Sequence, residues 1–291
     1  MSEDNSLAAK DVTLRFGGLL ALSSFNLTVR PGDLLGLIGP NGAGKTTAFN
    51  ALTGVYAVTN GTVTLSGQVV NGLSRAELWG RQFGPIGRVA GKLGPSSQRR
   101  SLRPHQICAL GLCRTFQNIR LFRELTALDN VRIAFHHGAR APWASSFALT
   151  PAFRAEEQQI TERADHFLEV MGLTGRRNEL ARNLPYGEQR RLEIARALAT
   201  GPKVLLLDEP AAGMNAREKI DLMDLIRRLR DEFKLGILVI EHDMRVVMGI
   251  CESITVLDHG VTIAAGKPEE VRRNPKVIEA YLGEPRAEAA P

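Results

Sequence analysis

Apolar residues along the chain follow two spacings that predict different elements. Short β-branched and leucine-rich runs predict strands at residues 12–16, 25–30, 33–38, 62–65, 203–208, 236–241 and 254–257. Longer segments in which apolar residues recur every three or four positions predict helices at residues 46–52, 127–135, 155–171, 188–199, 216–233 and 244–250. Several strands are bracketed by helices, which indicates an α/β protein.

Three of the predicted strands, at residues 34–38, 204–207 and 237–240, are continuously apolar. This is typical of parallel strands that helices cover on both faces. The earliest runs alternate, or break at a Pro-Gly or Asn-Gly pair, and they indicate an antiparallel sheet near the start of the chain. Residues 124–184 are almost entirely helical in pattern. We therefore expect a helical subdomain inserted between strands of the α/β core.

The composition is that of an ordinary globular protein. The 291 residues, of which 44% are hydrophobic and 23% charged, are enough for one large domain or two small ones. No apolar run reaches about 18 residues, and the first ten residues are polar and acidic, so neither a membrane span nor a secretion signal is expected. Cys108, Cys113 and Cys251 are too few for a disulfide framework, and no second pair completes a zinc site. They are expected to be reduced, buried thiols.

The net charge of +6 belongs to one segment of the chain. Residues 74–106 contain seven Arg and Lys side chains against Glu77 alone, and the rest of the chain has equal numbers of basic and acidic residues. Such a distribution argues against a nucleic-acid partner. Residues 80–103, rich in Gly, Pro, Ser and Arg, are expected to be a mobile basic insertion that is either solvated or in contact with anionic lipid headgroups. Residues 284–291 are expected to be a disordered tail.

A glycine-rich sequence, GPNGAGKTT at residues 39–47, follows a predicted strand and opens a predicted helix. It matches the pattern G-x-x-x-x-G-K-[ST] of a phosphate-binding loop. Glycines let backbone N–H groups approach phosphate oxygens, and the helix N-terminus adds the positive end of its dipole. Lys45 is expected to reach the β and γ phosphates of ATP, and the Thr46 hydroxyl to bind Mg²⁺. The predicted nucleotide-binding residues of the loop are Gly39, Asn41, Gly42, Ala43, Gly44, Lys45, Thr46 and Thr47.

Two acids end another predicted strand, in the sequence KVLLLDEP at residues 203–210. A buried strand would carry both acids to the end of the sheet beside the phosphate loop. We interpret Asp208 as a Mg²⁺ ligand, directly or through water, and Glu209 as the group that orients or deprotonates the attacking water. Taken alone, the motif is equally compatible with a strand that ends in acids at a turn.

Further motifs surround these two in the chain order of the ATP-binding cassette (ABC) ATPases, which the sequence resembles over residues 7–283. They are RFGG at 15–18, RTFQN at 114–118, LPYGEQ at 184–189, AAGMN at 211–215 and IEHD at 240–243. The resemblance implies a P-loop NTPase fold with a RecA-like core, an N-terminal antiparallel β subdomain and an inserted α-helical subdomain at about residues 118–190. These parts would form a single ABC ATPase domain.

The same resemblance implies a role for each motif. Phe16 would stack on adenine, although a phenylalanine at a strand end is also compatible with the core. Gln117 would contact Mg²⁺ and the attacking water, and His242 would contact the γ-phosphate. The signature motif would bind phosphate at a helix N-terminus. The residues that match the signature motif are Tyr186, Gly187, Glu188 and Gln189.

Two positions depart from the family pattern. Pro185 stands where the family most often has a serine that contacts the γ-phosphate, and a proline offers neither a hydroxyl nor an N–H. Asn215 stands where an aspartate is more common. ATP binding is expected in either case, and a nucleotide-binding switch with little turnover is an alternative to an ATPase.

In the ABC family the signature motif of one subunit closes over the phosphate loop of another, so the resemblance implies a dimer that sandwiches two ATP molecules.

The segments at 16–19, 114–126, 186–196, 208–215 and 280–284 most resemble the ATP-binding subunits of bacterial branched-chain amino acid importers. This implies a second ABC ATPase subunit, two transmembrane permease subunits and, indirectly, a periplasmic substrate-binding protein, with the chain on the cytoplasmic face of the bacterial inner membrane. ATPases of urea or amide import or of lipopolysaccharide export are alternatives. A soluble ABC ATPase that acts on nucleic acid or ribosomes is an alternative of another class.

Overall fold

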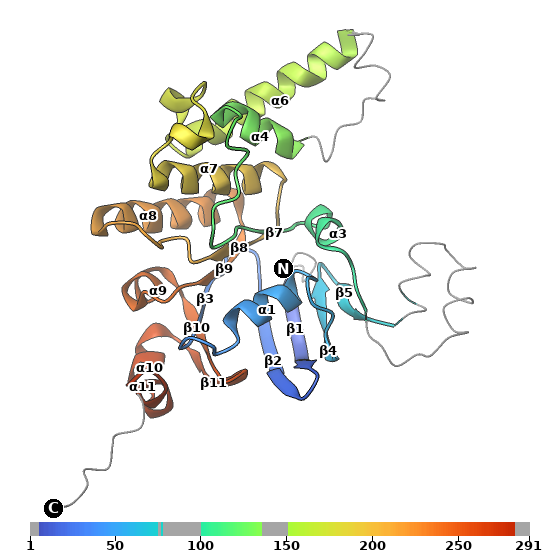
Figure 1. Cartoon of the computed structure of the whole chain (residues 1–291), viewed down its shortest axis with the longest axis vertical. Helices are drawn as coiled ribbons and strands as arrows, with labels where there is room; N and C mark the ends of the chain where they lie inside the picture. Colours follow the sequence, from blue (N-terminus) through green and yellow to red (C-terminus); the bar gives the residue numbers. More distant parts are fainter. Residues whose placement is uncertain (1–5, 75–76, 78–99, 136–150, 283–291) are drawn as a thin grey trace, which may run out of the picture.

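The computed structural model describes residues 6–74, 77, 100–135 and 151–282. Their strands form two sheets (Figure 1). The first sheet is antiparallel, in the order β2-β1-β4-β5-β6. Its strands are β1 (Leu7–Phe16), β2 (Leu19–Val29), β4 (Asn60–Leu65), β5 (Gln68–Leu73) and β6 (Arg100–Ser101). The antiparallel sheet expected near the start of the chain is therefore confirmed.

The second sheet is mainly parallel, in the order β11-β10-β3-β9-β8-β7. Its strands are β3 (Leu34–Ile38), β7 (Leu112–Arg114), β8 (Val204–Asp208), β9 (Gly236–Ile240), β10 (Ser253–Asp258) and β11 (Val261–Gly266). Neighbours from β10 to β7 are parallel, and β11 adds an antiparallel edge. The three continuously apolar strands of the sequence are β3, β9 and β8, which lie side by side in the parallel sheet as expected.

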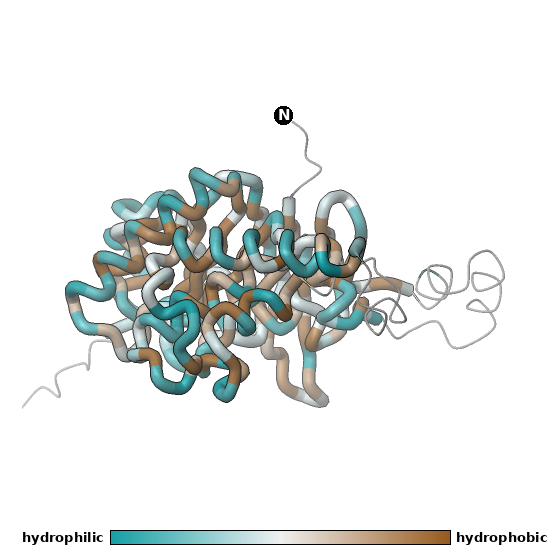
Figure 2. The backbone as a smooth tube through the Cα atoms, turned by 90° about the horizontal axis from the view of Figure 1, so that it is seen from above, coloured by the Kyte–Doolittle hydropathy of each residue, from teal (hydrophilic) through white to brown (hydrophobic). Residues whose placement is uncertain are grey.

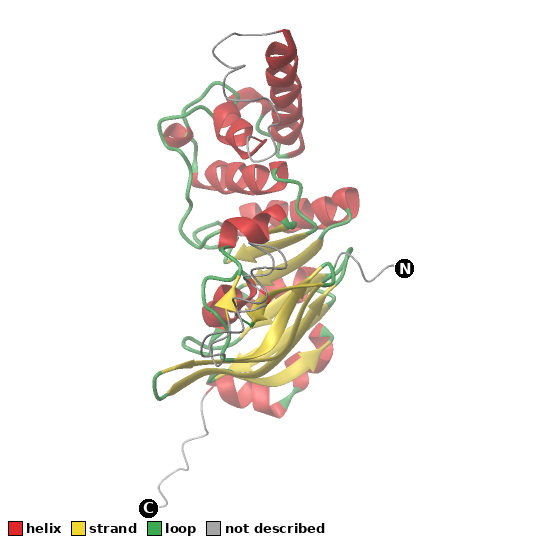
Figure 3. Cartoon of the chain, turned by 90° about the vertical axis from the view of Figure 1, so that its right-hand side faces the viewer, coloured by secondary structure: helices red, strands yellow, loops and turns green. Residues whose placement is uncertain are grey.

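Helices cover the parallel sheet and also form a separate layer at one end of the molecule (Figures 1 and 3). The layer contains α4 (Ala127–Phe135), α6 (Pro151–Val170) and α7 (Tyr186–Ala199), with short 3-10 turns at Thr174–Arg176 and Ala181–Asn183. The other helices are α1 (Lys45–Leu52), α3 (Pro104–Ala109), α8 (Ala216–Phe233), α9 (Met244–Ile250), α10 (Pro268–Arg273) and α11 (Pro275–Leu282). Among the described residues, none of the helices is both long and apolar enough to cross a bilayer.

The parallel sheet is buried on both faces because its side chains alternate between two hydrophobic clusters. Leu205 and Leu207 of β8 pack with the apolar sides of α7, α8 and α9. Val204 and Leu206 pack with α1 and the antiparallel sheet. In Figure 2 hydrophobic segments lie in the interior, and many outer helical turns are hydrophilic. Each fully buried Leu or Val side chain contributes about 1.5–3 kcal/mol, so these clusters hold the sheet and its helices together.

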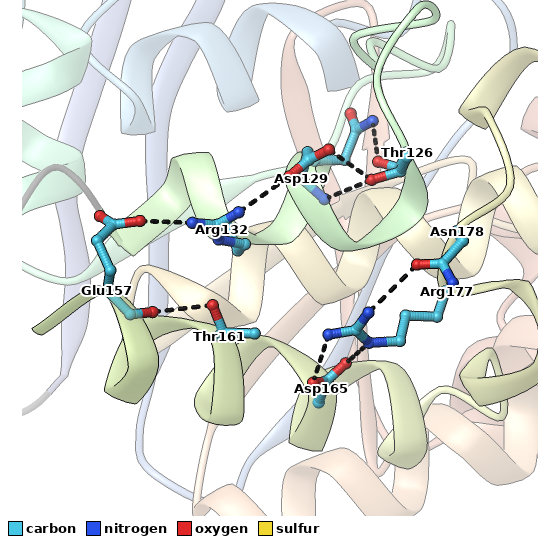
Figure 4. A network of polar contacts seen from close by, with 9 residues as sticks. Thr126, Asp129, Arg132, Glu157, Thr161, Asp165, Arg177 and Asn178 are labelled. Atoms are coloured by element: carbon cyan, nitrogen blue, oxygen red, sulfur yellow. Dashed lines mark hydrogen bonds and ion pairs between the residues drawn. The ribbon is translucent and has the colours of Figure 1, made fainter. Parts of the chain in front are cut away.

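Polar side chains join members of the helical layer near its surface (Figure 4). Arg132 of α4 forms ion pairs with Asp129 at 3.2 Å and with Glu157 of α6 at 2.5 Å. Arg177, which precedes α7, holds Asp165 of α6 with Nε 2.6 Å from Oδ1. Partly exposed pairs of this kind contribute about 0–1 kcal/mol each. The buried apolar contacts of α4, α6 and α7 therefore dominate the stability of the layer.

Most elements that the sequence predicts are confirmed, with boundary shifts of a few residues, but the expected bounds of two segments differ from the structure. The mobile insertion expected at residues 80–103 extends too far, because β6 pairs with β5 and Leu102 is buried, with its N–H bonded to the Val70 carbonyl at 2.8 Å. Residues 80–99 and the expected tail at 284–291 lie outside the described residues. The helical subdomain expected to end at about residue 190 has that boundary inside α7, which runs on to Ala199.

Candidate functional site

Four sequence motifs lie at the same edge of the parallel sheet. Strands β3, β9, β8 and β7 are adjacent and parallel, so their C-terminal ends meet there. The phosphate loop follows β3, His242 comes just after β9, Asp208 ends β8, and Gln117 comes three residues after β7. Ligands of open parallel sheets bind beyond the carboxyl ends of the strands. The fold thus gathers residues that lie far apart in sequence at the position where a ligand is expected.

The phosphate loop requires glycine at two positions. Gly39 has φ +154°, and a Cβ there would lie 2.1 Å from the Leu257 carbonyl oxygen. Gly44, which caps α1, has φ +99°, and a Cβ there would lie 3.0 Å from the Ala21 carbonyl oxygen. Larger residues fit neither the backbone conformation nor the space. The loop therefore leads tightly into the first turn of α1, whose N–H groups lack helical partners and suit an anion.

Lys45 is buried and folded over the loop. Its ammonium donates to the carbonyl oxygens of Gly39 at 2.7 Å and Pro40 at 2.9 Å. Burial lowers the pKa of Lys45, and the carboxylates of Glu209 and Asp208 oppose that shift. The ammonium therefore lies on the loop and within electrostatic reach of the two acids, and from this position it can bind phosphate oxygens.

Gln117 and His242 both approach the carboxylate of Glu209. Gln117 Nε2 donates to Glu209 Oε2 at 2.9 Å, and His242 Nδ1 lies 3.6 Å from the same oxygen. The Glu209 N–H bonds to the Ile240 carbonyl at 2.9 Å, which ties this residue to the end of β9. The Glu209 side chain is 21% exposed and that of His242 is 60% exposed, so water can reach the carboxylate. The three residues that the sequence suggests as catalytic therefore lie together.

The backbone of Glu209 is strained. Its φ of +46° lies in the left-handed region, which few residues other than glycine adopt. A conformation of this kind costs about 1–3 kcal/mol and persists only where the surrounding structure enforces it. Here the chain turns directly after β8, and the turn leaves the carboxylate beside Gln117 and His242.

Asp208 is buried and paired with a cation whose role the sequence does not reveal. Arg114 Nη2 lies 2.6 Å from Asp208 Oδ2, and Arg114 Nη1 donates to Asn50 Oδ1 of α1 at 2.7 Å. The pair thus joins β7, β8 and the helix that follows the phosphate loop. Arg114 belongs to the RTFQN motif, in which only Gln117 is assigned a role from the sequence. The strand that carries Arg114 has only three residues, so no local pattern in the sequence identifies this role.

Three oxygen-bearing side chains at this edge suit a magnesium ion. Thr46 is exposed at the start of α1. The ion pair with Arg114 uses Oδ2 of Asp208, and the bond from Gln117 to Glu209 uses the amide nitrogen. Hydroxyl, carboxylate and amide oxygens are the hard donors that Mg²⁺ takes. The predicted Mg²⁺ ligands Thr46, Gln117 and Asp208 therefore have the right chemistry for that ion.

The signature motif forms the start of α7. Pro185 caps this helix, and its carbonyl accepts the Gln189 N–H at 2.9 Å. Tyr186 is exposed, and Glu188 forms an ion pair with Arg176 at 3.0 Å. Within the described part of the chain, no hydrogen bond or ion pair joins residues 186–189 to the phosphate loop. The single chain therefore brings the phosphate loop to the catalytic residues but does not bond the signature motif to that loop.

A buried arginine of α7 clamps the segment that carries Gln117. Arg190 Nη1 donates to the Phe116 carbonyl at 2.6 Å and to Glu193 Oε2 at 2.7 Å, and Nη2 donates to the Gln117 carbonyl at 2.7 Å. Glu193, also buried, accepts the Arg120 N–H at 3.1 Å. Buried charges require such a partner and such hydrogen bonds. The sequence does not reveal this clamp, because both residues look like ordinary polar positions of a helix.

Glu241 is a second anchor that only the structure reveals. It is fully buried at the end of β9, where Oε1 accepts the Ala211 N–H at 2.7 Å and Oε2 accepts the His242 N–H at 3.2 Å. Burial raises the pKa of Glu241, while the backbone N–H of Ala211 and the charge of His242 oppose the shift. Glu241 thus fixes His242 and the segment after Glu209 relative to each other.

Phe16 lies on the surface rather than in the core. Phe16 is 43% exposed. Its ring contacts the Tyr56 ring edge to face, with centroids 5.0 Å apart and an interplanar angle of 78°. Phe16 ends β1 of a hairpin whose second strand borders the phosphate loop, because the Ala21 carbonyl lies against Gly44. An exposed aromatic pair is therefore carried on the hairpin beside the loop.

Known proteins resemble this chain in both sequence and fold. Residues 22–212 match the family model described as ABC transporter, and residues 261–287 match the model described as branched-chain amino acid ATP-binding cassette transporter. The chain is 44% identical over 278 residues to BraF of Pseudomonas aeruginosa and to LivG of Escherichia coli, both high-affinity branched-chain amino acid transport ATP-binding proteins. Each match covers 96% of this chain and 98% of the relative. The solved structure of MJ1267 in its ADP conformation, an ATP-binding cassette of an ABC transporter, has a TM-score of 0.72 and 28% identity, over 96% of this chain and 98% of that one.

Proposed function

The chain belongs to the ABC transporter family of ATPases, and from this premise we propose that it hydrolyses ATP to power the import of branched-chain amino acids through a membrane permease. The observation that carries the proposed hydrolysis is the approach of Gln117 and His242 to the Glu209 carboxylate at the edge that bears the phosphate loop. A phosphate loop alone would only bind a nucleotide. A carboxylate at its edge can also activate water.

In this proposal the backbone N–H groups of residues 39–47 and the first turn of α1 bind the phosphates of ATP. Lys45 exchanges its bonds to the two loop carbonyls for bonds to phosphate oxygens. Phe16 stacks on the adenine. Thr46, Asp208 and Gln117 would hold Mg²⁺, which would supply positive charge to offset that of the phosphates.

Glu209 is the proposed general base. Its carboxylate accepts a proton from the attacking water, and the Gln117 amide, which donates to Oε2, holds that carboxylate in place. His242 is well exposed and is proposed to reach the γ-phosphate. The surrounding structure enforces the strained backbone of Glu209 and in this way sets the position of the carboxylate before ATP binds.

ABC ATPase subunits of transporters dimerise and work with membrane permeases. We infer that the start of α7 closes over the phosphate loop of a second ABC ATPase subunit, either a copy of this chain or a related protein. The residues that would make this contact are Tyr186, Gly187, Glu188 and Gln189. Since Pro185 has neither a hydroxyl nor an N–H, the backbone N–H groups and the dipole of α7 would supply the phosphate contacts.

The proposed substrate rests on the relatives BraF and LivG and on the family model matched at residues 261–287. The latter favours an amino acid importer over a urea or amide importer or a lipopolysaccharide exporter. The proposed complex contains two transmembrane permease subunits and is supplied by a periplasmic substrate-binding protein, with this chain on the cytoplasmic face of the bacterial inner membrane. Residues 7–283 would act as one ABC ATPase domain, and the amino acid would not contact it.

The proposal is tested by reconstituting the chain with its copurified permease subunits in vesicles that contain the substrate-binding protein. ATP hydrolysis is measured with leucine, isoleucine, valine or urea. We expect a branched-chain amino acid to stimulate hydrolysis only when the binding protein is present. Stimulation by urea alone, or by none of the four, would contradict the proposed substrate.

A further inference from the structure

An open cleft with a volume of 460 Å³ lies between the helical layer and the α3–β7 segment. Two of its lining residues are cysteines, Cys108 of α3 and Cys113 of β7. Cys113 is buried, whereas Cys108 is half-buried, which corrects the expectation that all the thiols are buried. A thiol in the wall of an open cleft can be reached by a small reactant from solution.

The two cysteine sulfurs are in contact. Cys108 Sγ lies 3.2 Å from Cys113 Sγ. The intervening turn contains Gly111, with φ +104°, whose N–H bonds to the Cys108 carbonyl at 2.9 Å. The Gly111 carbonyl in turn accepts the N–H groups of Lys203 and Val204 at 2.8 and 3.0 Å. These backbone hydrogen bonds fix the turn and therefore keep the two cysteine sulfurs close together.

The surroundings of the pair favour a thiolate at Cys108. A hydrogen bond from Cys113 lowers the pKa of the Cys108 thiol to about 7, against partial burial. The same contact and burial raise the pKa of Cys113. The Thr200 hydroxyl lies 2.8 Å from Cys113 Sγ and can support this chain of hydrogen bonds. The charged and titratable side chains that line the same cleft are His105, Arg114, Glu193 and Arg196.

We propose that Cys108 and Cys113 form an oxidisable dithiol, a modification site at which a hydroperoxide converts the two thiols into an intramolecular disulfide. The Cys108 thiolate attacks one peroxide oxygen, so that an S–O bond forms, the O–O bond breaks, and the other oxygen leaves and takes up a proton as an alcohol or water. The Cys113 thiol then attacks the Cys108 sulfur. The S–S bond forms, the S–O bond breaks, and the departing hydroxide takes the Cys113 proton as water. The thiols lose two electrons and two protons, and the peroxide is reduced.

The disulfide would change the wall of the cleft. A disulfide bond is about 2.0 Å long, so the two sulfurs must approach each other by about 1 Å. The bond would then tie α3 to β7 across the turn at Gly111. Cys113 directly precedes Arg114, which pairs with Asp208. The modification therefore adjoins the candidate ATP site without using any residue assigned to catalysis.

The test exposes the reduced full-length chain at pH 7 to hydrogen peroxide, unfolds it, alkylates the free thiols with N-ethylmaleimide and analyses tryptic peptides by mass spectrometry. Both cysteines fall in one peptide, residues 101–114, because trypsin does not cleave between Arg103 and Pro104. We expect this peptide to lose two hydrogens and take up no maleimide, and dithiothreitol to reverse the change. Cys251 is the internal control, because burial raises its pKa to about 12.

Two variants assign the roles of the cysteines. In Cys113→Ser, peroxide is expected to yield a sulfenic acid at Cys108 that dimedone traps, and in Cys108→Ser, Cys113 is expected to remain a thiol. Three outcomes would each overturn the proposal. They are uptake of two maleimides by the peroxide-treated peptide, oxidation of Cys251 at the same rate as the pair, and a disulfide between two chains. No ATPase measurement enters this test, so its outcome is independent of the proposed transport function.

Discussion

Replacing Arg190 with methionine is expected to weaken the fold and to slow hydrolysis, for two separable reasons. The guanidinium is fully buried and holds the Phe116 and Gln117 carbonyls as well as the Glu193 carboxylate. Methionine fills part of the space but leaves Glu193 buried without its partner. Removing one member of a buried ion pair costs about 3–5 kcal/mol. That is a large share of the roughly 5–15 kcal/mol by which folded proteins are stable.

A second substitution separates stability from positioning. In the double variant Arg190→Met, Glu193→Leu neither charge of this pair remains, so most of the lost free energy of unfolding is expected to return. The Gln117 carbonyl still lacks its donor, and the Gln117 amide can move away from Glu209. Displacing a catalytic group by about 1 Å can cost about 100-fold in rate. We therefore expect a folded double variant whose kcat is reduced by about 10- to 100-fold.

Urea unfolding measures the free energy of unfolding of each variant, and steady-state kinetics measures kcat for ATP hydrolysis. Arg191→Met, on the neighbouring position of α7, is the matched control and is expected to change neither quantity strongly. Glu193→Gln is a milder variant that can still accept the Arg120 N–H. If the double variant recovers both stability and kcat, Arg190 does not position Gln117. A loss below about 1 kcal/mol in Arg190→Met would refute the cost assigned to the buried pair.

Three further predictions follow from contacts of single residues. Gly39→Ala is expected to abolish nucleotide binding, because the added Cβ would meet a backbone carbonyl oxygen at 2.1 Å. Binding is measured with a fluorescent ATP analogue, and wild-type affinity would contradict the loop geometry. Glu241→Ala leaves the buried Ala211 N–H without its acceptor and is expected to lower the free energy of unfolding by about 1–3 kcal/mol in urea titrations; an unchanged value would count against this anchor. The pKa of Cys108 is lowered from 9.0 to about 7, so its thiolate forms at a lower pH than in the unfolded chain. Its alkylation by iodoacetamide should therefore have a midpoint near pH 7 and far exceed that of Cys251, and a midpoint near 9 would show that Cys113 does not stabilise the thiolate.

The site residues that the sequence predicts are those that stand next to a recognisable pattern in the chain. The phosphate loop, Asp208, Glu209 and His242 each follow an apolar strand, and parallel strands bring their C-terminal ends to one edge. Gln117 follows β7, a strand too short to show periodicity, and it was identified from its motif.

The supporting contacts have no such local signal. Arg114 and Asp208 lie 94 positions apart in the chain, and Arg190 lies 73 positions from the Gln117 carbonyl that it holds. The first pair depends on β7 lying beside β8 in the sheet, and the second depends on how α7 packs against the segment after β7. The strands β6 and β7 are not predicted because two and three residues are too few to show a period. The strands β5 and β11 have six residues each, but β11 shows no apolar alternation, and most of its residues are only partly buried.

The central claim is that Glu209 activates the water that cleaves ATP. Its most direct test compares ATP hydrolysis and ATP-dependent dimerisation, by light scattering, for the parent chain and Glu209→Gln, with Glu232→Gln on the exposed side of α8 as the control. General base catalysis contributes about 100- to 10,000-fold in rate. We predict that Glu209→Gln binds ATP, hydrolyses it slower by a factor in this range and accumulates as an ATP-bound dimer. Equal hydrolysis rates for Glu209→Gln and the parent chain would contradict the claim.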